Sequence, residues 1–246
     1  MTRTEERVQL SPDASDAPPG LLDNHLGGEG APRYRQYQLE LIAPYCGRWV
    51  LEVGSGLGEF ASQLEGPERL VLTDAEPWLV ERLQERYRSR PDVDVAHLAL
   101  PESLDLDRTV DTVVALNVLE HVEEDVVALR NLTKVMEPGG RLILWVPAYP
   151  ALYGDFDRQV GHVRRYTPKS LRAAVEAAGL HVEVLRPVNF LGGLAWWLAV
   201  HLGGTGTPKP ALVRLYDSLV IPATRLIERM VSPPFGQSLL CVASVA

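Results

Sequence analysis

The sequence predicts an α/β fold in which a mostly parallel sheet is covered by helices on both faces. Apolar runs of strand length alternate along the chain with segments whose apolar residues recur at helical spacing. The runs are continuously apolar, which is typical of strands buried on both faces. A glycine-rich turn at residues 54–58 follows the first run directly. Because glycines let the backbone approach a ligand closely, this strand and turn predict a site for a nucleotide-like ligand.

The composition favours a single globular domain. The 246 residues are 46% hydrophobic, which is enough for one sizeable core. The net charge of −8 argues against a nucleic-acid partner, because phosphate binding requires a surplus of Lys and Arg on one face. Cys46 and Cys241 lie in apolar contexts and are expected to be free thiols, which suits a reducing cytoplasm. The charged, polar N-terminus lacks the apolar segment of a signal peptide.

Seven strands and six helices follow from the apolar pattern. The strands are expected at residues 49–53, 69–73, 93–98, 110–116, 141–146, 181–185 and 238–244. The helices are expected at residues 33–45, from the glycine turn to about 64, and at 77–88, 123–136, 167–178 and 211–230. In the first helix, Tyr34 and Tyr37 are expected either to pack on the sheet or to form a lid over a ligand at the glycine turn. Thr167 followed by Pro168 is a typical helix start.

Three segments stand apart from this alternation. Residues 1–30 are rich in Asp, Ser, Pro and Gly and are predicted to be a flexible arm before a single domain at 31–246. Residues 147–166 show neither period and predict an unusually long loop, which is often functional. Residues 189–237 form an insertion that we expect to be a helical cap, although ordinary core or a dimer interface would also explain it. Within it, the apolar stretch 190–202 is shorter than the ~20 residues that span a bilayer.

Four motifs carry a resemblance to a known family. They are LEVGSGLGEF, VLTDAEP, DTVVALNVLEHV and MEPGGRLILWVP, in that order. The chain thereby resembles the class I S-adenosylmethionine-dependent methyltransferases over about residues 48–186, and the type 11/12-like bacterial small-molecule subgroup in particular. A nicotinamide-dependent enzyme is disfavoured, because Glu59 occupies the third glycine position of the dinucleotide fingerprint. The resemblance implies a Rossmann-like seven-stranded sheet of order 3-2-1-4-5-7-6, with strand seven antiparallel.

The resemblance also implies S-adenosyl-L-methionine as the cofactor, with S-adenosyl-L-homocysteine as its product. Asp74, at the end of strand two, corresponds to the residue that accepts both ribose hydroxyls, and Glu52 to an acid near the amine. Many relatives carry an adenine-binding Asp near the position of Ala99, so backbone groups and apolar packing are expected to hold adenine here. The expected cofactor-binding residues are Glu52, Gly54, Ser55, Gly56, Gly58, Asp74, Ala75, Leu98, Ala99, Asn117 and Leu119.

The catalytic candidates are His162, His121 and Tyr166, all near the expected ligand edge of the sheet. Either histidine could act as a general base or orient an acceptor, or could instead hold its own loop together. Tyr166, like Tyr153, could position an acceptor with its hydroxyl or simply pack.

Charged residues of the long loop leave two further alternatives. Arg164 and Arg165 could bind an acidic acceptor or form ion pairs with Asp155 or Asp157. These two acids could in principle ligate a metal, but no matching third ligand is evident after strand four, and no metal is expected.

The expected function is methyl transfer to a small, hydrophobic or aromatic acceptor in bacterial specialised, natural-product metabolism. We expect a cytoplasmic monomer or homodimer. One alternative is a methyltransferase for a lipid-linked or glycan substrate at the membrane surface. Another is a cofactor-binding regulatory module without catalysis. O, N and C acceptors all remain open, because one fold can support all three.

Overall fold

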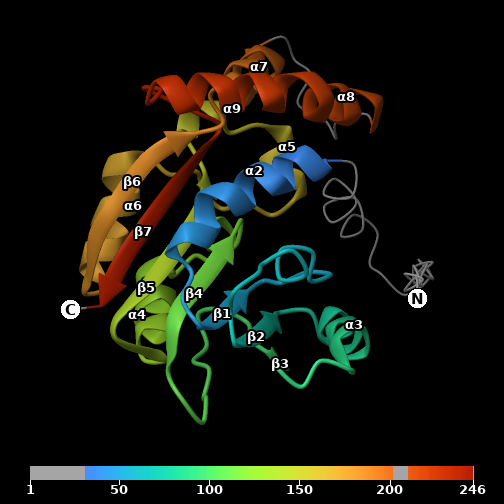
Figure 1. The fold of residues 1–246 in the computed structure, drawn as a ribbon. Coiled ribbons are helices and arrows are strands. Elements are labelled where there is room, and N and C mark those ends of the chain that lie inside the picture. Colours follow the sequence, from blue (N-terminus) through green and yellow to red (C-terminus); the bar gives the residue numbers. More distant parts are fainter. Residues whose placement is uncertain (1–30, 202–209, 246) are drawn as a thin grey trace, which may run out of the picture.

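A computed structural model describes residues 31–201 and 210–245, so the predicted arm of residues 1–30 lies outside the described residues. The seven-stranded sheet has the order β3-β2-β1-β4-β5-β7-β6 (Figure 1), which confirms the expected fold. Its strands are β1 (Trp49–Val53), β2 (Arg69–Asp74), β3 (Val93–His97), β4 (Val110–Leu116), β5 (Met136–Pro147), β6 (Leu180–Val188) and β7 (Ser238–Val245). Only β7 runs antiparallel to its neighbours, β5 and β6. β1 pairs in parallel with both β2 and β4, so the strand order reverses beside the glycine turn, where such sheets bind ligands.

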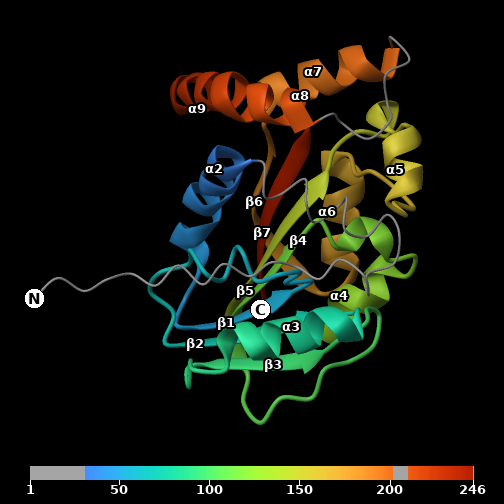
Figure 2. The same cartoon turned by 90° about the vertical axis from the view of Figure 1, so that its right-hand side faces the viewer.

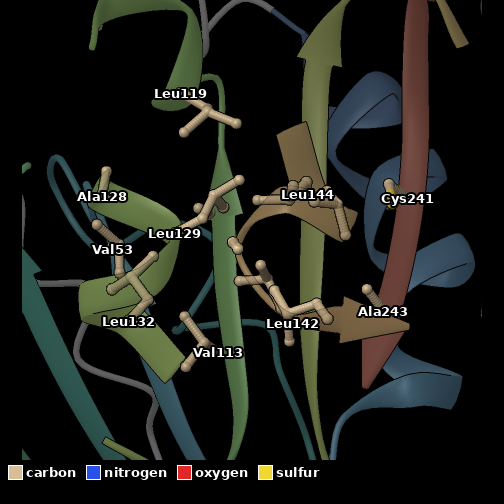
Figure 3. Close-up of a cluster of buried hydrophobic side chains, with 14 of the residues drawn as sticks. Val53, Val113, Leu119, Ala128, Leu129, Leu132, Leu142, Leu144, Cys241 and Ala243 are labelled. Atoms are coloured by element: carbon tan, nitrogen blue, oxygen red, sulfur yellow. The ribbon is translucent and has the colours of Figure 1, made fainter. Parts of the chain in front are cut away.

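Helices cover both faces of the sheet, because successive side chains of a strand point to opposite faces. In β5, Leu142 and Leu144 face the core under α4 (Asp125–Thr133) and α6 (Pro168–Ala177), which Figure 3 shows in part. Trp145 faces the second core, under α2 (Pro32–Ile42) and α3 (Pro77–Tyr87). Thr167 caps α6 as expected, since its hydroxyl accepts a hydrogen bond from the Ser170 amide at 3.0 Å.

The two tyrosines of α2 pack on the middle of the sheet. The rings of Tyr34 and Tyr37 meet the Trp145 ring edge-on, with centroid distances of 6.2 and 5.9 Å. Asp217 accepts hydrogen bonds from the amides of Arg33 and Tyr34 at 3.2 and 2.8 Å. These contacts favour the packing interpretation of the two tyrosines over a lid.

Two expected elements differ in the structure. Residues 56–63 form consecutive turns rather than the helix predicted up to residue 64. Gly56 and Gly58 have φ angles of +54° and +74°, which interrupt the right-handed helical path. The segment 147–166 is not wholly irregular, because it contains η3 (Pro150–Leu152) and α5 (Asp155–Gln159). A parallel bridge between Ala148 and Tyr166 closes this segment at its base, and we call residues 147–166 the lobe.

The insertion between β6 and β7 is helical, as predicted, where it is described. It contains α7 (Phe190–His201), α8 (Pro210–Leu215), the π-helical turn η4 (Tyr216–Val220) and α9 (Ile221–Met230), which together we call the cap. Figures 1 and 2 show the cap lying across one end of the sheet, beyond the tips of β4 and β6, rather than on a face. Within the described ranges, no helix combines the length and apolarity needed to cross a bilayer.

Candidate functional site

The glycine turn after β1 requires glycine for two separate reasons. Gly54, Gly56 and Gly58 all have positive φ, a backbone conformation that residues other than glycine rarely adopt. A Cβ on Gly54 would also lie 2.5 Å from a methyl of Val118, which follows β4. The glycine turn therefore packs closely against Val118. A ligand at this turn would contact the backbone of the glycines and not a side chain.

Asp74 links this turn to the end of β2. Its Oδ2 accepts a hydrogen bond from the Gly56 amide at 2.9 Å, and its Oδ1 accepts one from the Glu76 amide at 3.0 Å. The side chain is buried beside the turn. Each carboxylate oxygen has a second lone pair, so the pair of oxygens can still accept two ligand hydroxyls. This geometry fits the ribose contact that the resemblance implies.

Glu52 is a buried acid in the middle of β1, and its Oε2 has no hydrogen-bond partner among the described residues. Burial is the main cause that raises the pKa of Glu52 to about 8; a hydrogen bond from Ser55 opposes the shift, and the charge of Asp74 adds to it. An ionised carboxylate at this place lacks a compensating cation. The amine of the implied cofactor is such a cation, so the orphaned oxygen fits that ligand.

The remaining expected cofactor residues follow β2, β3 and β4 at the same carboxyl edge. The side chains of Leu98 and Leu119 are almost completely buried in the core, so a ligand would meet their backbone. Asn117 has a φ of +54° and turns the chain sharply at the end of β4. The Ala75 carbonyl lies 2.9 Å from Nε2 of His97, a histidine that the motif comparison did not single out. Ala99 is half-buried one residue beyond Leu98.

His162 is held in the lobe by a buried ion pair. Its Nδ1 lies 2.8 Å from Oδ1 of Asp157, which is fully buried. Arg165 donates to both oxygens of the same carboxylate, at 2.8 and 3.0 Å. Burial opposes ionisation of Asp157, but the hydrogen bonds from His162 and Arg165 hold its pKa below the usual value. Nδ1 of His162 therefore donates its proton to Asp157, which directs Nε2 toward Glu120.

Glu120 and His121, in η2 (Leu119–His121), meet His162 from the other side. The two imidazole rings lie edge to face with centroids 4.7 Å apart. Nε2 of His162 is 3.7 Å from Oε1 of Glu120, whose side chain is completely buried. Burial raises the pKa of Glu120 to about 8, and burial together with His162 lowers the pKa of His121 to about 4. The structure thus brings the two expected catalytic histidines together around a buried acid.

Other expected residues of the lobe have packing contacts. Tyr166 is buried, and its hydroxyl donates to Oδ2 of Asp125 at 2.8 Å. The Tyr153 hydroxyl donates to the His162 carbonyl at 2.7 Å. Arg164 pairs with Asp125 at 2.8 Å, a partner that was not anticipated. These contacts favour the packing and ion-pair interpretations over contact with an acceptor.

The cap contacts the lobe through Trp196 of α7. Its Nε1 donates to the Leu152 carbonyl at 2.9 Å, and its ring meets Phe156 edge-on at 5.4 Å. The guanidinium of Arg165 lies over the same ring, 5.4 Å from its centroid. Two other aromatics of the cap lie elsewhere: Phe190 packs on Phe235, and Tyr216 bonds to Asn189.

Two residues of the site, Glu120 and Arg165, have positions around His162 that the sequence did not indicate. Glu120 received no role from the sequence, although an acid in the turn after a buried strand is a usable signal for a site. Arg165 was expected either to bind an acceptor or to pair with an acid, and its pairing with Asp157 fits the second expectation. Its role in orienting His162 depends on the folded lobe and has no local sequence signal.

Known proteins share this architecture and these motifs. A family model described as a methyltransferase domain matches residues 33–185. The chain is 31% identical over 191 residues to a Mycolicibacterium smegmatis protein named as an S-adenosylmethionine-dependent methyltransferase, covering 75% of this chain and 71% of that protein. It is 28% identical over 162 residues to a 37.1 kDa protein in transposon TN4556 of Streptomyces fradiae, covering 63% of this chain but only 47% of that protein. Among solved structures, an S-adenosylmethionine-dependent methyltransferase from Mesorhizobium loti superposes with a TM-score of 0.57 at 14% identity, covering 85% of this chain and 96% of that one.

Proposed function

Because the chain belongs to the class I S-adenosylmethionine-dependent methyltransferases, we propose that it methylates a small, apolar or aromatic acceptor. The acceptor would lie between the lobe and the cap, near the two histidines. The natural-product metabolism of bacteria is the setting that we propose for it. The single observation that carries the choice of acceptor is the aromatic contact of Trp196 with Phe156 of the lobe, beside Arg165, whose partner Asp157 also holds His162.

The donor side would be held by the carboxyl edge of β1, β2 and β4. S-Adenosylmethionine supplies a methyl group made electrophilic by its positively charged sulfur. Asp74 would accept the ribose hydroxyls, Glu52 would face the amine, and the backbone of the glycine turn would line the methionine moiety. Since all three are fixed by strand ends, they can orient the methyl group with little rearrangement.

The acceptor side would be oriented by the lobe. Asp157 fixes the tautomer of His162, so that the lone pair of Nε2 faces Glu120 and His121 rather than Asp157. An acceptor hydroxyl or N–H can donate a hydrogen bond to such a lone pair and lose its proton there as the new bond to the methyl carbon forms. The electron pair of the broken carbon–sulfur bond remains on sulfur, which leaves S-adenosylhomocysteine.

Replacing His162 by alanine tests this assignment. A panel of small phenols, aromatic amines and apolar alcohols is first screened with wild type for release of S-adenosylhomocysteine. We expect His162→Ala to reduce turnover of the best acceptor by about 10²- to 10⁴-fold, with unchanged calorimetric affinity for S-adenosylmethionine. His181→Ala, an exposed histidine of β6, is the matched control and should retain full turnover. Loss of cofactor binding in correctly folded His162→Ala would move His162 out of the acceptor site.

A second candidate is a lipid-linked acceptor at a membrane surface, and one observation favours it. Of the eleven large hydrophobic side chains found exposed in the described residues, nine belong to the insertion: Leu194, Trp197, Leu198, Leu212, Leu215, Leu219, Leu226, Met230 and Val231. Helices with such a surface can lie in a bilayer interface. Co-sedimentation with anionic phospholipid vesicles separates the two candidates, and a protein that stays in the supernatant rejects the lipid-linked acceptor.

A further inference from the structure

Glu120, His121 and His162 form a side-chain cluster with the composition of a metal centre. One potential ligand atom from each residue can be chosen so that all three lie within 4.8 Å of one another. Glu120 and His121 come from η2, whereas His162 comes from the lobe, about 40 residues further along the chain. The cluster therefore depends on the docking of the lobe onto the end of β4.

The carboxyl group of Glu120 lacks a hydrogen-bonding partner among the described residues. Its side chain is fully buried, and neither Oε1 nor Oε2 has a hydrogen bond to the described part of the chain. Nε2 of His162 lies 3.7 Å from Oε1, too far for a hydrogen bond. A buried carboxyl group that faces an imidazole nitrogen without a hydrogen bond can be compensated by a cation bound between the two.

The Nδ1 contacts of both imidazoles leave Nε2 available to a cation. Nδ1 of His162 donates to Asp157, which Arg165 and the Gly154 amide hold in place. Nδ1 of His121 lies 3.3 Å from the Gly161 carbonyl, which can only accept. A histidine whose Nδ1–H binds a carboxylate or a carbonyl and whose Nε2 is free is the usual arrangement of a metal-binding histidine. The lobe thus provides the outer hydrogen bonds of both ligands.

The donor set indicates which ions would bind. Two neutral imidazole nitrogens and one carboxylate oxygen suit Zn²⁺ and other divalent first-row transition metals, whereas Mg²⁺ and Ca²⁺ prefer sites built from oxygen alone. Ligands of a tetrahedral zinc ion lie roughly 3.4 Å apart, close to the 3.7 Å between His162 and Glu120. His121 is the exposed member of the cluster, so its ring can approach the ion with little repacking.

We propose that Glu120, His121 and His162 bind one divalent transition-metal ion, with Zn²⁺ as the best-fitting probe. Three protein ligands leave a tetrahedral ion one open position, which is typical of catalytic rather than structural sites. Catalytic use of that position rests on the proposed function: the ion would bind an acceptor oxygen and lower its pKa, and Nε2 of His162 would then be a ligand rather than the proton acceptor. This proposal departs from the expectation of no metal, which was argued from Asp155 and Asp157, and Asp157 instead serves as the outer partner of His162.

Metal binding can be measured without any acceptor. Full-length protein is stripped with a chelator and titrated with Zn²⁺ against a chromophoric competitor, and Co²⁺ is added separately to record its visible absorption spectrum. Wild type should bind one Zn²⁺ equivalent tightly, and Co²⁺ should give the intense bands of a four-coordinate site. Affinity for Zn²⁺ should fall at least about tenfold in His121→Ala and in Glu120→Gln. His181→Ala, remote from the cluster, should bind as wild type does.

Both variants are expected to fold, so a loss of zinc affinity would report on the site itself. His121 is exposed, and Glu120→Gln preserves the volume of the buried side chain while removing one ligand oxygen, so both should bind S-adenosylhomocysteine normally. Equal zinc affinity in wild type, His121→Ala and Glu120→Gln would overturn the metal site. Full methyl transfer by protein that binds no zinc would overturn it as well, while leaving the proposed function standing. Zinc bound at these three residues in a protein that methylates no acceptor would support the site and reject the proposed function.

Discussion

The expected donor edge and the proposed acceptor side of this molecule are built by different means. At the donor edge, backbone conformation dominates: positive φ angles at Gly54, Gly56 and Gly58 place amides beside Asp74, which closes β2. On the acceptor side, single side chains from distant segments converge, as His162 does with Glu120. A site made of strand ends tolerates little change of conformation, whereas one made of side chains on a lobe can change its ligand with a few substitutions.

The largest effect on stability is expected on the acceptor side, at Arg165. Replacing Arg165 by alanine leaves the Asp157 carboxylate buried without its bidentate partner, and losing one member of a buried ion pair costs about 3–5 kcal/mol. Urea unfolding of Arg165→Ala should show a loss of that size. Arg158→Ala, in the same lobe, removes an exposed ion pair with Asp155 and should cost less than about 0.5 kcal/mol. Similar small losses in both variants would mean that the ion pair does not hold the lobe.

A smaller effect is expected at the donor edge, where the backbone itself is tested. Gly54→Ala forces a residue with a side chain to a φ of +69° and brings its Cβ within 2.5 Å of Val118, which should destabilise the fold by about 1–3 kcal/mol and weaken cofactor binding. Gly139→Ala is a matched control, because Gly139 has a φ of +77° but no atom near the new Cβ. If both variants lose the same stability and both bind cofactor normally, strain alone matters and the close approach to Val118 does not.

The last effect concerns the pH dependence at Glu52, and it vanishes at low pH. Its pKa of about 8 in the fold exceeds the value near 4.3 of an unfolded chain. The folded state therefore holds the proton more tightly, so this contribution to stability is complete below about pH 4 and is lost as the pH rises toward 8. Glu52→Gln should match wild type in urea unfolding at pH 4 and exceed its stability by about 3 kcal/mol at pH 7, because each pH unit between the two pKa values costs about 1.4 kcal/mol. A stability difference that stays constant with pH would show that the pKa of Glu52 is not raised in the fold.

The contrast between backbone-built and side-chain-built parts also explains what could be predicted from the sequence. The strands, the glycine turn and the cap of α6 at Thr167 depend on local patterns, and the strand order came from the motif resemblance; the structure bears all of them out. The helix after the glycine turn was wrong, because positive φ at Gly56 and Gly58 interrupts it.

The contacts that the sequence did not predict join residues far apart in the chain. Asp217 caps α2 from 183 residues away, and Trp196 reaches the lobe from α7. No local period encodes such pairs, since they form only when separate elements are already packed.

The central claim is that the carboxyl edge of β1 and β2 binds S-adenosylmethionine. Isothermal titration of S-adenosylhomocysteine into wild type and Asp74→Ala tests it most directly, with Asp94→Ala, an exposed acid on β3, as the control. Wild type and Asp94→Ala should bind one equivalent, and Asp74→Ala should bind about 100-fold more weakly because two charge-assisted hydrogen bonds are lost. Absence of binding in the wild type, or equal affinity in Asp74→Ala, would contradict this claim.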